Sequence, residues 1–93
     1  MKIHSKIYKK LLDNWSWRKI PFQKGVSGEF RIAIRSGKEQ FLLSNPTASG
    51  ILPERFAELV ERIKDAKDDE MRIEITYIRK FGKFWIEEVQ RKI

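Results

Sequence analysis

The chain has 93 residues, of which 41% are hydrophobic and 35% are charged, and its net charge is +7. This length predicts one compact domain over residues 1–93, with residues 1–4 frayed. Cysteine is absent, which excludes a disulfide framework and thiolate metal sites, and no apolar run reaches the roughly 18 residues of a membrane span. Because no apolar leader core follows residues 1–6, we expect a cytoplasmic protein.

The charge is distributed unevenly along the chain. Residues 1–24 contain seven Lys or Arg against one Asp, and residues 71–93 contain six against three Glu. Residues 51–70 are acidic, with four Lys or Arg against seven Asp or Glu. Basic ends around an acidic centre favour a polyanion or an acidic protein surface as the partner.

The first predicted element is an amphipathic helix from Ser5, its N-cap, to about Trp15. Its apolar residues recur at steps of three and four: Ile7, Tyr8, Leu11, Leu12 and Trp15. Three lysines fall mainly on the other side, so the helix would be basic. Residues 17–24 contain Pro21 and precede a glycine-containing stretch, which predicts an irregular connection rich in aromatic and basic side chains.

A hairpin is predicted over residues 30–43. Residues 30–35 alternate apolar and polar side chains, as a half-buried strand does, and residues 40–43 return as its partner. Ser36-Gly37 is the predicted two-residue turn, which would pair Phe30 with Leu43 on the buried side. Arg31 and Arg35 would then emerge on the opposite face. The following loop, residues 44–50, lacks the lysine and spacing of a phosphate-binding loop and is expected to be an ordinary connection.

A second helix is predicted to begin at Pro53, a residue that suits a first helical turn. Its apolar stripe is Phe56, Leu59, Val60, Ile63 and Ala66. Its carboxylates, Glu54, Glu58, Glu61 and Asp65, have spacings that could gather them around magnesium. Interleaved basic residues, among them Arg62 four residues after Glu58, favour a salt-bridged solvent face instead.

The last hairpin begins with strict alternation over residues 71–77. If its turn is Phe81-Gly82, Tyr77 pairs with Ile86 towards the core and Ile78 pairs with Trp85 on the opposite face. A three-residue loop would exchange these faces, and the sequence leaves both registers open. Together the elements predict an α+β fold in helix-hairpin-helix-hairpin order, with a four-stranded, mostly antiparallel sheet packed with two helices.

Basic and aromatic side chains gather in three segments of this scheme. Nucleic-acid binding requires cations that neutralise phosphates, and single strands are also held by rings on which bases stack. The candidate binding residues are Trp17, Arg18, Lys19, Lys24, Arg31, Arg35, Arg79, Lys80, Lys83 and Trp85. The competing interpretation is that the rings fill the core and the lysines only keep the surface soluble.

The leading functional hypothesis is a small basic protein that binds DNA or RNA, with single-stranded or non-specific binding favoured. The alternative is a protein-interaction module, such as a phage or mobile-element inhibitor or adaptor, acting through a sheet edge or as a homodimer. No catalytic residue, cofactor or metal is predicted, because His4 is the only histidine and no nucleophile lies in a catalytic context. A small ribonuclease that uses only Arg and Lys stays open as a third class.

Overall fold

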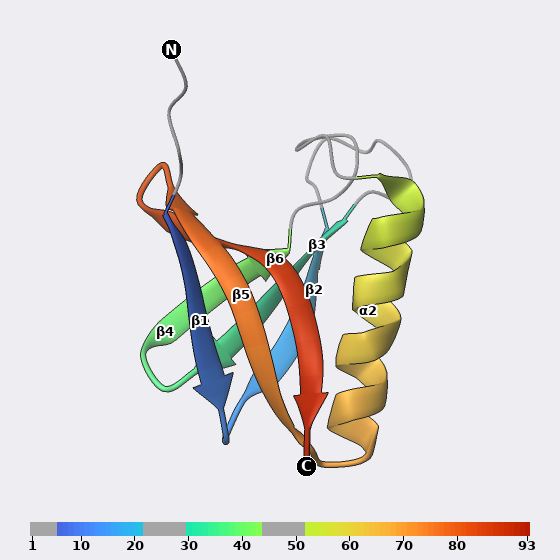
Figure 1. The fold of residues 1–93 in the computed structure, drawn as a ribbon. Helices are drawn as coiled ribbons and strands as arrows, with labels where there is room; N and C mark the ends of the chain where they lie inside the picture. Colours follow the sequence, from blue (N-terminus) through green and yellow to red (C-terminus); the bar gives the residue numbers. More distant parts are fainter. Residues whose placement is uncertain (1–5, 22–29, 44–51) are drawn as a thin grey trace.

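The computed structural model describes residues 6–21, 30–43 and 52–93 (Figure 1). The elements are β1 (Ile7–Leu12), β2 (Ser16–Pro21), β3 (Phe30–Ser36), β4 (Glu39–Leu43), α2 (Pro53–Asp68), β5 (Arg72–Lys80) and β6 (Lys83–Lys92). Within these ranges α2 is the only helix, and the six strands form one mixed sheet. The predicted four-stranded sheet with two helices, in helix-hairpin-helix-hairpin order, is therefore wrong. The expected fraying of residues 1–4 and the loop at 44–50 lie outside the described residues.

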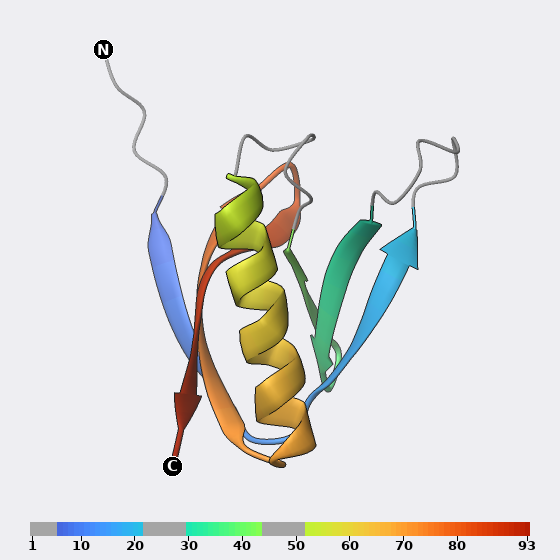
Figure 2. The ribbon, with the colours of Figure 1, turned by 90° about the vertical axis from the view of Figure 1, so that its right-hand side faces the viewer.

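The strand order forces the sheet to curl. The order is β1-β5-β6-β4-β3-β2, so the first two strands in the chain lie at opposite edges of the sheet. Only residues 13–15 connect them, and this link reaches about 15 Å at full extension. A flat six-stranded sheet would separate its edges by about 24 Å. The edges must therefore approach each other at this end of the molecule, and they diverge at the other end (Figure 2).

Strand β1 replaces the first predicted helix. The positions 7, 8, 11 and 12 match a helical spacing, but β1 pairs with β5 through six consecutive residue pairs. The alternation is hidden in the sequence because Lys10 occupies an inward position between Tyr8 and Leu12. Its amine forms an ion pair with Glu39 at the start of β4, across the curled sheet. Long-range backbone pairing thus overrides the local pattern.

Strand β2 replaces most of the predicted irregular connection. Residues 16–21 pair antiparallel with β3, and Pro21 closes the strand at the sheet edge, where a missing N–H is tolerated. Lys24, which the sequence placed in the same connection, lies outside the described residues.

The β3–β4 hairpin exists, but its register differs from the predicted one. Ser36 pairs with Glu39, so the turn is Gly37-Lys38 rather than Ser36-Gly37, and Leu43 faces Ile32 instead of Phe30. Gly37 has φ of 62° and supplies the left-handed conformation that the turn requires. The pairing has slipped by two residues, so the same side chains still face the core.

Helix α2 confirms the prediction of an amphipathic helix that begins at Pro53. Phe56, Leu59, Ile63 and Ala66 are buried, and Val60 is half-buried against the core. Figure 2 shows the helix lying across the open side of the curled sheet. We call the sheet face towards α2 the inner face and the opposite face the outer face.

The sheet consists of two halves joined along a short seam. In the β1-β5-β6 half and in the β4-β3-β2 half all neighbours are antiparallel, whereas β4 and β6 run parallel. The seam has two residue pairs, Phe41 with Phe84 and Leu42 with Trp85. On the inner face it is filled by three rings in mutual contact, those of Phe41, Tyr77 and Phe84, and the Tyr8 ring stacks on Tyr77. The Trp85 pair lies on the outer side of the same seam.

Candidate nucleic-acid interface

The β5–β6 hairpin adopts the first of the two registers that the sequence left open. Lys80 pairs with Lys83, so the turn is Phe81-Gly82, and Ile78 pairs with Trp85. Tyr77 pairs with Ile86, and both are buried in the core. Strand alternation then puts Ile78, Lys80, Lys83 and Trp85 together on the outer face.

A row of paired residues crosses the outer face through all six strands, apolar on five of them and ending at Arg18 on β2. Neighbouring pairs connect Ile7, Ile78, Trp85, Leu42, Ala33 and Arg18 in this order. Leu42 and Ala33 are 5% and 3% exposed, although neither belongs to the core cluster beneath the helix. The outer face therefore carries a thin apolar layer of its own, with Trp85 over the seam.

Trp85 is half-buried and held by two contacts. Its indole Nε1 donates a hydrogen bond to the Lys80 carbonyl oxygen at 2.9 Å, which ties the ring to its own hairpin. The Arg31 guanidinium lies over the ring, 5.3 Å from the centroid. This cation–π contact joins the two halves of the sheet on the outer side.

The structure brings six of the ten predicted site residues onto one face. Alternation in the register assigns them to the outer face: Arg18, Arg31, Arg35, Lys80, Lys83 and Trp85. We call these six the outer basic surface. Trp17, Lys19 and Arg79 instead pair with inward-facing residues, respectively Ile34, Ile32 and Phe84. Lys19 lies over the Phe30 ring at 4.5 Å, so part of its role is structural.

Several basic residues in the described part of the chain, on both faces of the sheet, form no ion pair with a carboxylate. Among the described residues, Arg18, Arg35, Lys80 and Lys83 form no ion pair with a carboxylate. Strands β2 and β3 contain no Asp or Glu at all. The carboxylate of β5 nearest in register on this face, Glu74, is about 20 Å along the strand from Lys80 and lies 3.8 Å from the Lys92 amine.

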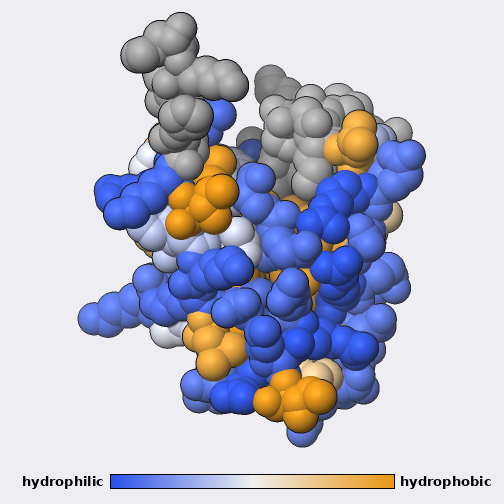
Figure 3. Space-filling view, viewed as in Figure 1, coloured by the Kyte–Doolittle hydropathy of each residue, from blue (hydrophilic) through white to orange (hydrophobic). Residues whose placement is uncertain are grey.

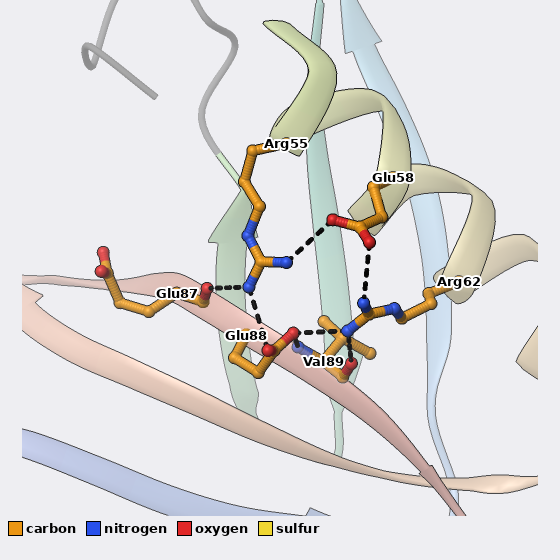
Figure 4. Close-up of polar contacts among 6 residues, drawn as sticks. All are labelled: Arg55, Glu58, Arg62, Glu87, Glu88 and Val89. Carbon is orange, nitrogen blue, oxygen red and sulfur yellow. Dashed lines mark hydrogen bonds and ion pairs between the residues drawn. The ribbon is translucent and has the colours of Figure 1, made fainter. Parts of the chain in front are cut away.

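Ion pairs concentrate where α2 meets β6 (Figure 4). Arg62 contacts Glu88 at 2.6 Å and Glu58 at 3.1 Å, and Arg55 contacts the same two carboxylates at 3.0 and 2.9 Å. Arg62 also donates to the Val89 carbonyl oxygen at 2.9 Å. The predicted Glu58–Arg62 pair and the salt-bridged character of this helix face are thereby confirmed.

Two groups of this network have shifted pKa values. Partial burial of Glu88 acts to raise its pKa, but hydrogen bonds from Arg55 and the Val89 N–H outweigh it and hold the pKa below its usual value. The pKa of Arg55 is raised, first by its hydrogen bond to Glu88 and then by that to Glu58. The network thus holds two arginines and two glutamates together between α2 and β6.

A small polar pocket lies where β1 passes to β2. It is lined by Asp13, Asn14, Trp15, Lys67, Glu70 and Met71. Its polar groups serve the fold, because the Lys67 amine donates to the Trp15 carbonyl oxygen and the Trp15 Nε1 donates to the Met71 carbonyl at 3.0 Å. Across residues 6–21, 30–43 and 52–93, no group of three Asp, Glu, His or Cys side chains is placed to hold a metal ion. In the same ranges no helix is long and apolar enough to cross a membrane.

No protein-family model matches the chain, and no curated protein or solved structure matches it either. The side of the molecule shown in Figure 3 is largely hydrophilic, with hydrophobic groups in small separate patches. Small, separate apolar patches of this kind are ordinary on protein surfaces.

The sequence reasoning missed one residue of the hairpin tip. Phe81 was interpreted only as part of a turn, yet its side chain is 83% exposed. A signal was present, since the preferred residues of a two-residue hairpin turn are Asn, Asp and Gly rather than an aromatic. A phenylalanine at this position therefore needs an explanation beyond chain reversal.

Proposed function

We propose that the protein binds nucleic acid without marked sequence specificity through the outer basic surface. One observation carries this proposal: Trp85 lies on the outer face together with Lys80 and Lys83, which form no ion pair with a carboxylate in the described part of the chain. Arginine and lysine side chains would neutralise phosphates and release counterions, and an indole would receive a base. We propose binding alone, without catalysis, because none of the six residues that define this surface is a carboxylate or a histidine that could act as a general base.

Single strands suit this surface better than duplexes. Helix α2, the element that could enter a major groove, packs against the sheet through its apolar stripe and exposes carboxylates such as Glu54, Glu58 and Glu61. These carboxylates would repel a phosphate backbone. The outer face of the sheet offers the Trp85 ring together with cations, which favours unpaired bases that can stack on the ring.

The test is a salt titration of oligonucleotide affinity with a matched set of hairpin variants. K80A and K83A each remove an outer cation, whereas R79A removes the same charge from the inner side of the same hairpin. For a single strand, log K falls with log salt, and each lost phosphate contact makes this slope less steep by about 0.7. We expect this change for K80A and K83A and not for R79A. An equal effect of all three, or no binding by the wild type at low salt, would refute the proposal.

A protein-interaction role is the second candidate, supported by the two sheet edges. Within the described residues β1 and β2 each pair on one side only, so their other backbone edges are available for strand addition or dimerisation. Strand β1 also exposes Ile7 and Leu11, at 64% and 43%. Recovery of one stoichiometric protein partner after nuclease treatment, with no oligonucleotide binding in solution, would favour this role over the first.

A further inference from the structure

The tip of the β5–β6 hairpin presents an aromatic ring in an unfavourable backbone conformation. Phe81 has φ of 56° and Gly82 has φ of 71°, so both turn residues are left-handed. Glycine adopts this conformation freely, whereas a bulky side chain at positive φ is strained. The same ring is 83% exposed, so burial does not offset the strain. Strain at an exposed position is a mark of function rather than of stability.

We propose that Phe81 is a second stacking platform, on which a base of a bound single strand lies after the strand has crossed Trp85. This inference rests on the proposed function and extends it from the outer face to the hairpin tip. It specifies the ligand as a single-stranded polynucleotide with at least two unstacked bases. It also assigns Lys80 and Lys83, which flank the ring in the sequence, to the phosphates on either side of that base.

The geometry of the hairpin supports a path from Trp85 to Phe81. Trp85 is two residues beyond Lys83 on β6, about 7 Å along the strand, and the turn adds a few ångströms. The two rings are therefore about 10 Å apart along the hairpin, close enough for one short single strand to contact both. The Trp85–Lys80 hydrogen bond holds both platforms on one rigid unit. The Lys80 amine is 5.5 Å from the Phe81 centroid, so a cation already accompanies the ring.

A duplex fits this tip less well than a single strand. Paired bases present their edges in the grooves, while their flat faces are covered by neighbouring pairs. An exposed ring between two cations therefore gains most from bases that are already unstacked. Binding of a duplex through wedge-like insertion of Phe81 is the competing outcome, and the experiment below separates the two.

The experiment compares F81N and F81L with the wild type. F81N introduces a residue that tolerates the left-handed turn, so we expect a higher midpoint of thermal unfolding. F81L keeps an apolar side chain at the same strained position but removes the ring, so its midpoint should stay close to that of the wild type. Affinity for a short oligothymidylate should fall about tenfold in both variants. Affinity for a hairpin duplex should not change.

The outcomes separate this inference from the proposed function. If K80A and K83A weaken binding while F81N and F81L bind oligothymidylate like the wild type, the stacking role is wrong and the basic surface stands. An equal loss of duplex affinity in F81N would overturn the single-strand assignment. Unchanged affinity in F81L together with a loss in F81N would show that the ring itself is not required. If the wild type binds no oligonucleotide, both ideas fall.

Discussion

Each of the three tryptophans occupies a different environment. Trp15 is 6% exposed and donates its Nε1 hydrogen to Met71 within the core. Trp17 faces inward from β2 and packs on the edge of that core. Trp85 alone of the three points to the outer face, where Arg31 covers part of its ring. From composition alone, each of these rings could either stack on bases or fill the core. The strand register shows which rings face inward and which faces outward.

Because only Trp85 of the three tryptophans faces outward, we predict that it is the tryptophan on which a base stacks. W85A should weaken binding of a single strand by about 5- to 100-fold and affect a duplex less, because a stacked base is lost. W17A should leave both affinities nearly unchanged, since its ring faces the core. The measurement is a titration followed by fluorescence anisotropy of a labelled oligonucleotide. A loss in W17A as large as that in W85A would contradict the assignment of the outer face.

At the level of elements, helix α2 was predicted from the sequence, but its contact with β6 was not. The stripe of Phe56, Leu59 and Ile63 identified the helix and its buried face in the sequence. It did not indicate that Arg55 and Arg62 would meet Glu88, a residue 26 positions beyond Arg62. Pairing within the helix follows a fixed spacing, whereas pairing between elements depends on how they pack.

This network predicts a pH-dependent contribution to stability. The pKa of Glu88 is lower in the folded protein than its ordinary value of 4.5, so the carboxylate stabilises the fold above that pH. The contribution is lost as the pH falls through the depressed folded pKa. E88Q should therefore lower the free energy of unfolding by about 1–2 kcal/mol at pH 7. The difference from the wild type should shrink below about pH 4.

Urea denaturation at several pH values measures this effect, with E61Q as the matched control. Among the described residues Glu61 pairs only with Lys64, at 3.5 Å, and its side chain is 65% exposed. We expect less than about 0.5 kcal/mol for E61Q at every pH. A constant difference between E88Q and the wild type from pH 7 to pH 3 would show that ionisation of Glu88 does not stabilise the fold.

On the scale of the whole molecule, the seam between β4 and β6 holds the two halves together. Two backbone pairs make the junction, so side chains must supply most of the cohesion. Phe41 is 0% exposed and contacts Tyr77 and Phe84 of the other half. Arg31 reaches over Trp85 on the outer side. The same junction therefore stabilises the fold on its inner side and contributes Arg31 and Trp85 to the proposed interface on its outer side.

F41A tests how much the seam contributes to the whole fold. Truncation of a fully buried ring should cost about 3–5 kcal/mol in the free energy of unfolding, because a cavity opens between the halves. F30A is the control, since Phe30 is half-buried at the start of β3, and about 1–2 kcal/mol is expected there. Chemical denaturation followed by circular dichroism compares the two. Equal losses would mean that the ring cluster is not the main contact between the halves.

The sequence by itself determined those features that depend on local periodicity and turn chemistry. The apolar stripe that begins at Phe56 predicted helix α2. Gly82 reduced the β5–β6 turn to two possible registers. The alternation of side chains in β3 predicted which of its residues face inward. In each case the signal lies within a few residues of the feature. Its error over residues 7–12 has the same origin, because Lys10 breaks the alternation and its partner Glu39 lies far along the chain.

Tertiary structure alone decided which distant strands are neighbours, and with them the proposed site. The three-residue link after Leu12 curls the sheet, and the parallel seam brings Trp85 beside Leu42 and Arg31 over its ring. Only then do the cations of β2 and β3 share a face with those of the β5–β6 hairpin. Strand pairing is stabilised by backbone hydrogen bonds and burial between segments remote in sequence, so no local pattern specifies it.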